Sequence, residues 1–170
     1  MGAQGRSIAA RQRPRVGDRY PKKEGAPFTA LKGCVCVDGD TYDIPKIIQT
    51  AELRQTICGG TMPTFGHRQK CGNDLAKYDD FSATTHVTKG KNIPPSLILY
   101  FLGNPDTAAQ ALRLEAALQG TDVSARALGK GDTNHSRLND DPGRADDPAS
   151  EEFLRFLDDP VGTESQAPAR

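Results

Sequence analysis

The chain has little hydrophobic sequence and no excess of charge of either sign. Only 36% of its 170 residues are hydrophobic, and no run approaches the roughly 18 apolar residues of a membrane-spanning helix. No apolar segment follows the basic residues near the start, so we expect a soluble, cytoplasmic protein that does not bind membranes. The 22 basic and 22 acidic residues balance, so no net field indicates nucleic acid as a partner.

Histidine and cysteine are also scarce, which argues against a metal centre. Cys34 and Cys36 lie inside one apolar run, whereas zinc sites usually space cysteines by about two to four residues on turns. We therefore interpret these residues, with Cys58 and Cys71, as buried reduced thiols, and expect no metal and no cofactor. The alternative of a metal hydrolase would need more than the three histidines present; its ligands would be Asp132, His135, Asp140 and Asp141.

The sequence divides into a basic arm at 1–27, a folded part at 28–159 and a polar tail at 160–170. The arm has almost no apolar periodicity, which is typical of a disordered segment, and the tail is expected to be flexible. Within the folded part, apolar runs and helical spacing alternate, which favours an α/β fold with a mostly parallel sheet flanked by helices. The expected strands are 32–37, 97–102 and 121–127, and the expected helices are 107–119 and 149–158.

Three of these elements carry clear local signals. Residues 97–102 form a short, continuous apolar run after a Pro-Pro breaker, as a fully buried strand does. In the following helix, one stripe of apolar residues recurs at helical spacing, made of Ala108, Ala111, Leu112 and Leu118. Gly120 stands where a helix commonly ends. For the last helix, either Asp147-Pro148 or Ser150 provides a start signal.

Asp106 and His135 follow two successive expected strands. In open parallel sheets, functional groups collect at the carboxyl ends of the strands. A carboxylate after one strand and a histidine in a loop after the next is how an α/β-hydrolase places its acid and base. Each residue also has a simpler interpretation: Asp106 as the cap of the next helix, and His135 as a surface loop residue.

The folded part resembles the C-terminal half of the carboxylesterase and arylformamidase-like branch of the α/β-hydrolases. This resemblance implies a partial (truncated) form of that fold. The resembling segments lie in the same order as in the family: Leu31-Lys32-Gly33, Val37-Asp38-Gly39 with Tyr42-Asp43-Ile44-Pro45, Ser82 through Val87, Gly90 through Pro95, Pro105-Asp106-Thr107, and His135 through Asn139, Asp141 and Gly143 to Asp147-Pro148.

The resemblance implies a serine hydrolase that acts on small esters through a Ser-Asp-His triad. It implies Asp106 as the acid and His135 as the base. The nucleophile would be Ser7, in a variant Gly-x-Ser-x-Gly motif whose last position is Ala9. The backbone N–H of Ile8 would donate to the oxyanion. We expect the side chains of Asp106 and His135 to meet, with the ring donating an N–H to the carboxylate.

Two other functions remain open at this point. One is a lactone-opening hydrolase with the same site; the other is a non-catalytic remnant, which could form a homodimer through an uncovered sheet edge. Ser82 is a second candidate nucleophile but is expected to be structural. His67 and His86 are expected to be surface or structural residues.

Overall fold

The computed structural model describes residues 30–59, 66–145 and 147–160. The expected basic arm, with Ser7 and Ile8, lies outside these residues, as does all of the expected tail except Pro160. The described elements in chain order are β1 (Cys34–Val37), α3 (Ile44–Cys58), α4 (His67–Cys71), α5 (Leu75–Phe81), the short helix η2 (Thr84–His86), β2 (Ser96–Phe101), α6 (Pro105–Gln119), β3 (Ala125–Lys130), α7 (His135–Asp140) and α8 (Pro148–Asp158).

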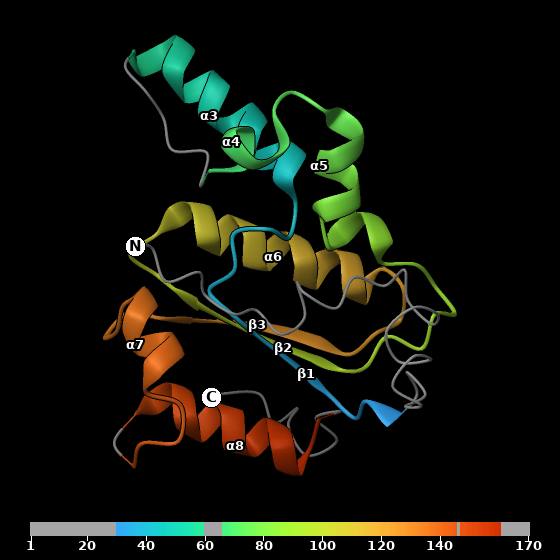
Figure 1. Ribbon diagram of the computed structural model, residues 1–170. Coiled ribbons are helices and arrows are strands. Elements are labelled where there is room, and N and C mark those ends of the chain that lie inside the picture. The colour runs from blue at the N-terminus through green and yellow to red at the C-terminus, as the bar shows by residue number, and fades with distance from the viewer. Residues whose placement is uncertain (1–29, 60–65, 146, 161–170) are drawn as a thin grey trace, which may run out of the picture.

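The strands form a parallel sheet in the order β1-β2-β3, with helices on both faces (Figure 1). The register aligns Leu99 of β2 with Val37 on one side and Leu128 on the other. Helices α3 to α6 lie on one side of the sheet, and α7 and α8 lie on the other (Figure 1). The expected parallel α/β arrangement is therefore confirmed.

The middle strand supplies side chains to two hydrophobic cores because alternate residues of a strand point to opposite faces. Ile98 belongs to the core beneath α6, whereas Leu97 and Leu99 belong to the core against α7 and α8. Both faces of β2 are thus covered, which explains its unbroken apolar sequence. The buried members are Cys36, Tyr42, Ile98, Ala111, Leu114 and Leu118 in the first core, and Leu97, Leu99, Leu138, Ala149 and Phe156 in the second.

Helix α6 begins and ends close to the predicted positions. Asn104, not Asp106, is its N-cap, and its side chain accepts hydrogen bonds from the backbone N–H groups of Asp106 and Thr107. Pro105 occupies the first turn, where its missing N–H is not needed. Gly120 follows the last helical residue, as predicted.

The third strand begins four residues later than predicted. The N–H groups of Thr121 and Val123 both bind the carbonyl of Leu118, and Asp122 has a left-handed φ of 63°. This turn closes the end of α6 and delays the start of β3 to Ala125. Alternation of apolar residues in the sequence does not distinguish such a turn from the first residues of a strand.

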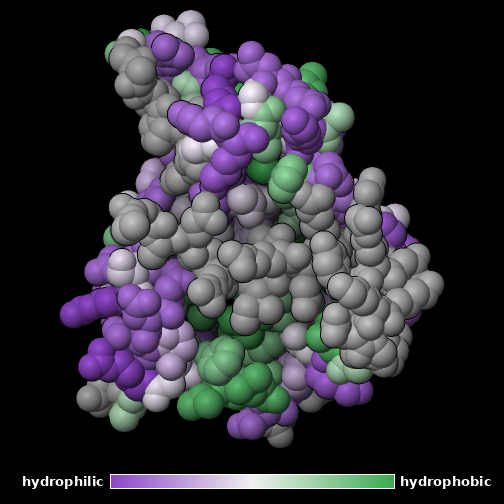
Figure 2. Space-filling view, viewed as in Figure 1, coloured by the Kyte–Doolittle hydropathy of each residue, from purple (hydrophilic) through white to green (hydrophobic). Residues whose placement is uncertain are grey.

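The surface over α3 to α5 is mostly hydrophilic, and an apolar area lies low in the same view, near α8 (Figure 2). Leu154 and Leu157 of α8 are among the exposed large hydrophobic residues. No helix in the described ranges has both the length and the apolar character needed to cross a membrane. Within the described sheet, β1 and β3 are the edge strands, and a homodimer formed through such an edge stays a prediction.

Candidate acid–base site at the carboxyl edge of the sheet

Asp38 terminates β1 and links it to β2 in two ways. Its backbone N–H donates to the carbonyl of Leu99 at 2.7 Å, which continues the parallel ladder. Its φ is 43°, so the chain turns out of the sheet in the left-handed region that aspartate tolerates better than most residues. The carboxylate Oδ1 then accepts the N–H of Phe101 at 3.0 Å, a donor that a continuing β1 would otherwise have bound.

The turn after Asp38 depends on Gly39. A Cβ at this position would lie 2.6 Å from the ring of Tyr42, and the Tyr42 side chain is fully buried. The Gly39 N–H also donates to the Tyr42 hydroxyl at 3.2 Å. The close approach of backbone and ring therefore fixes the path of the chain just beyond Asp38.

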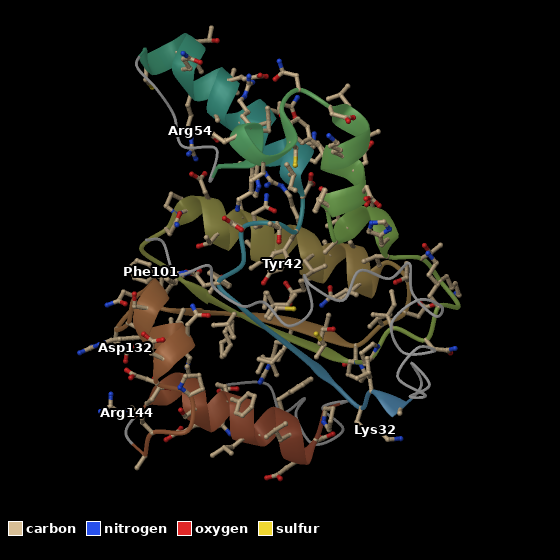
Figure 3. All side chains as sticks on the ribbon, viewed as in Figure 1. Lys32, Tyr42, Arg54, Phe101, Asp132 and Arg144 are labelled. Atoms are coloured by element: carbon tan, nitrogen blue, oxygen red, sulfur yellow. The ribbon has the colours of Figure 1, made fainter. Side chains whose placement is uncertain are left out.

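His135 reaches Asp38 from the carboxyl end of β3. It is the first residue of α7 rather than part of a loop, because the Asn134 side chain caps that helix by accepting from the N–H of Arg137. The same edge carries Phe101 and Asp132, which Figure 3 shows near α7. The Asn139 side chain donates to the His135 carbonyl at 2.7 Å, which further fixes the first turn of α7.

The two side chains form an Asp–His pair. Nδ1 of His135 donates to Oδ2 of Asp38 at 2.8 Å. The Asp38 side chain is 1% exposed, whereas that of His135 is 45% exposed. A buried carboxylate that binds Nδ1–H selects the tautomer in which Nε2 is unprotonated. No described residue forms a hydrogen bond with Nε2, so this nitrogen can accept a proton from a bound molecule.

The expected contact between Asp106 and His135 was wrong. Both Asp106 oxygens instead bind Nη1 of Arg54, at 2.7 and 2.8 Å, and Figure 3 shows Arg54 reaching from α3 toward α6. The hydrogen bond and the charge of Asp106 raise the pKa of the Arg54 guanidinium. Asp106 also lies in the first turn of α6, where a carboxylate interacts favourably with the helix dipole.

Asp38 is a candidate site residue that the sequence did not single out. Its signal was present, since an aspartate follows directly after the apolar run that forms β1. The rule that pointed to Asp106, a carboxylate at the end of a parallel strand, applies equally to Asp38. Spacing along the sequence could not show which of the two carboxylates His135 would reach.

The other candidate residues have structural roles. The Ser82 side chain is fully buried; its hydroxyl donates to the carbonyl of Tyr78 and accepts the N–H of Ile44. Nε2 of His67 donates to the carbonyl of Asp40, and burial lowers the pKa of this histidine. Nε2 of His86 binds the carbonyl of Asp80 in the same way.

The four cysteines are free, as expected, but they are not all buried. Cys36 and Cys71 are buried, Cys34 is half-buried and Cys58 is exposed. The sulfur atoms of Cys34 and Cys36 lie 3.9 Å apart, and this thiol–thiol contact lowers the pKa of Cys34. In the described part of the chain, no group of three or more His, Cys, Asp or Glu residues is arranged to hold a metal ion.

No family model, curated protein or solved structure matches this chain. The resemblance to α/β-hydrolases therefore stays a prediction from the sequence.

Proposed function

We propose that this protein is a cytoplasmic serine hydrolase of the carboxylesterase type, in which Asp38 and His135 form the acid–base pair. The observation that carries this proposal is the hydrogen bond between buried Asp38 and Nδ1 of His135, whose side chain is 45% exposed. The same arrangement orients the general base in serine hydrolases of unrelated folds. Its position at the carboxyl edge of a parallel sheet is where such groups gather.

In this proposal, the nucleophile Ser7 and the oxyanion donor Ile8 are assigned from the resemblance of the sequence to the family. Ser7 would attack the ester carbonyl while His135 Nε2 takes the hydroxyl proton, and the N–H of Ile8 would bind the developing oxyanion. His135 would return that proton to the departing alcohol, and a water molecule activated by the same nitrogen would release the acid. Asp38, in place of Asp106, would hold the ring and stabilise its protonated form.

The test is hydrolysis of p-nitrophenyl acetate by the purified full-length chain. Replacing His135 with glutamine should lower kcat/KM by about 10²–10⁴-fold, the usual contribution of a positioned base. Asp38→Asn should cause a similar loss, because an amide that donates to Nδ1 favours the wrong tautomer. His86→Gln is the matched control, since it also removes a hydrogen-bonded, half-buried histidine, and it should leave the rate unchanged.

Two further variants identify the remaining groups. Ser7→Ala should abolish both turnover and covalent labelling by a fluorophosphonate. Asp106→Asn should retain most activity, because Asp106 is bound to Arg54. A large loss in Asp106→Asn with little effect of Asp38→Asn would restore Asp106 as the acid. Hydrolysis no faster than that of the His135→Gln variant would contradict the proposed function and favour a non-catalytic protein.

A further inference from the structure

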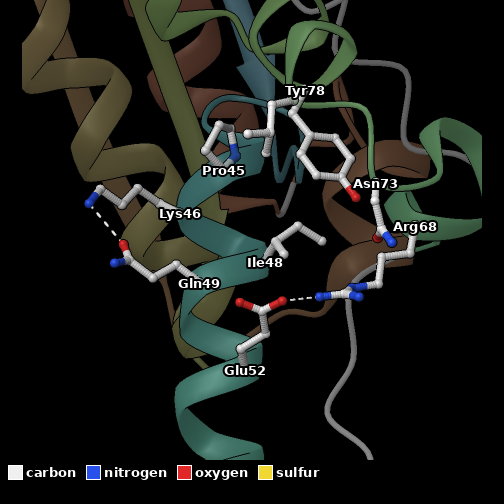
Figure 4. A pocket seen from close by; sticks show the side chains of 9 residues that line it. Pro45, Lys46, Ile48, Gln49, Glu52, Arg68, Asn73 and Tyr78 are labelled. Atoms are coloured by element: carbon white, nitrogen blue, oxygen red, sulfur yellow. Dashed lines mark hydrogen bonds and ion pairs between the residues drawn. The ribbon is translucent and has the colours of Figure 1, made fainter.

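A second candidate site lies away from the Asp–His pair, between α3, α4 and α5. It is an open cavity of about 460 Å³, within the range of roughly 300–1,000 Å³ that small-molecule sites occupy. Figure 4 shows Lys46 and Gln49 on one side and Arg68 and Asn73 on the other, with Ile48 between them.

The base of this cavity is apolar and well packed. Ile48 is 7% exposed and Tyr78 is 3% exposed, and both belong to the small core of α3, α4 and α5. The Tyr78 hydroxyl donates to the carbonyl of Gly72, so its hydrogen is used and its ring forms part of the wall (Figure 4). Pro45 adds further apolar surface. The apolar body of a ligand could therefore contact these side chains while the hydrogen bond of Tyr78 stays intact.

The polar side chains at the rim of the cavity carry N–H groups that form no hydrogen bond with a described residue. Arg68 binds Glu52 through Nη2, which leaves most of the five N–H groups of its guanidinium available. Lys46 binds only the neutral oxygen of Gln49, at 2.9 Å, and has no carboxylate partner among the described residues. The side-chain amide of Asn73 likewise has no partner there.

Among the described residues that line the cavity, the charges add up to one positive charge, since Lys46 and Arg68 are opposed by Glu52 alone. A single anionic group would balance this charge, and a carboxylate matches the planar fork of an arginine. We propose that the cavity between α3, α4 and α5 binds a small organic monocarboxylate, with its carboxylate near Arg68 and Asn73 and its apolar body against Ile48 and Tyr78. This site is independent of the proposed esterase activity, because none of its residues belongs to the acid–base pair.

The experiment is an NMR titration of the ¹⁵N-labelled full-length chain with benzoate, repeated with the neutral analogue benzamide. Benzoate should shift the Asn73 side-chain amide and the backbone signals of Ile48 and Tyr78 in a saturable way. Benzamide should bind at least about tenfold more weakly, because it cannot form the charge-assisted hydrogen bonds. Equal affinity for the two compounds would overturn the proposal, as would shifts centred on His135.

Charge variants test the recognition in both directions. Arg68→Gln should weaken benzoate binding by about tenfold or more, whereas Glu52→Gln should strengthen it by removing the competing carboxylate. Arg126→Gln is the matched control, since it breaks a surface ion pair with Glu152 outside the cavity, and it should leave the affinity unchanged. Glu52→Gln tests the proposal even if Arg68→Gln folds poorly. Weaker binding in Glu52→Gln, or equal losses in Arg68→Gln and Arg126→Gln, would show that the cavity does not recognise the anion.

Discussion

Replacing Asp38 with alanine should destabilise the fold much more than replacing it with asparagine. Alanine removes both carboxylate hydrogen bonds and leaves the partly buried N–H of Phe101 without its acceptor, which costs about 1–3 kcal/mol. It also places an ordinary side chain at a φ of 43°, which adds about 1–2 kcal/mol. The expected total is about 2–5 kcal/mol. Asparagine can keep the bond to Phe101 and tolerates the left-handed conformation, so we expect a loss of about 1 kcal/mol.

Urea denaturation followed by circular dichroism measures both changes. A double-mutant cycle with His135→Gln then isolates the Asp38–His135 hydrogen bond. Because the histidine ring is 45% exposed, its coupling to Asp38 should be at the low end for a charged hydrogen bond, about 1 kcal/mol. A destabilisation below about 1 kcal/mol for Asp38→Ala would refute the reasoning. A coupling energy indistinguishable from zero would refute the proposed pairing.

Three further predictions concern other parts of the fold. Burial lowers the pKa of His67 from its ordinary 6.5. As the pH falls below 6.5, the unfolded chain therefore binds a proton before the folded chain does, and the free energy of unfolding decreases. In urea melts at pH 7 and pH 5, His67→Asn should lose less stability than the parent over that interval. Arg54→Gln should cost less than about 1 kcal/mol in the same melts, because its ion pair with Asp106 is partly exposed; a loss above about 2 kcal/mol would contradict this. Gly39→Ala should cost about 1–3 kcal/mol, because its Cβ would lie 2.6 Å from the buried ring of Tyr42; unchanged stability would show that the turn can open.

The sequence predicts best the elements whose environment is uniform along their length. Leu97, Ile98 and Leu99 are apolar because both faces of β2 are covered, and α6 buries Ala111, Leu114 and Leu118 between a proline near its start and a glycine after its end. Leu102 and Leu112, which the sequence placed in the same apolar sets, are exposed. The start of β3 was misplaced, because the residues before it form a turn through backbone bonds to Leu118. Such bonds join backbone groups, so the residue types in the sequence do not reveal them.

The sequence predicted that His135 follows β3 at the carboxyl edge of the sheet, but not which carboxylate it contacts. Asp106 and His135 do follow adjacent parallel strands, yet a strand end supplies only a place at the edge of the sheet. Which carboxylate meets the ring depends on the left-handed turn at Asp38 and on Arg54 binding Asp106. Arg54 is 52 residues before Asp106 in the sequence, so no local pattern reveals that competition.

The tautomer of His135 tests the central claim most directly. Long-range ¹H–¹⁵N correlation spectra of the neutral ring should show the proton on Nδ1 in the parent chain, because Asp38 accepts it. The same tautomer should persist in Asp106→Asn and change to Nε2–H in Asp38→Asn. A proton on Nε2 in the parent chain, or a change of tautomer in Asp106→Asn alone, would contradict the assignment of Asp38 as the residue that orients the base.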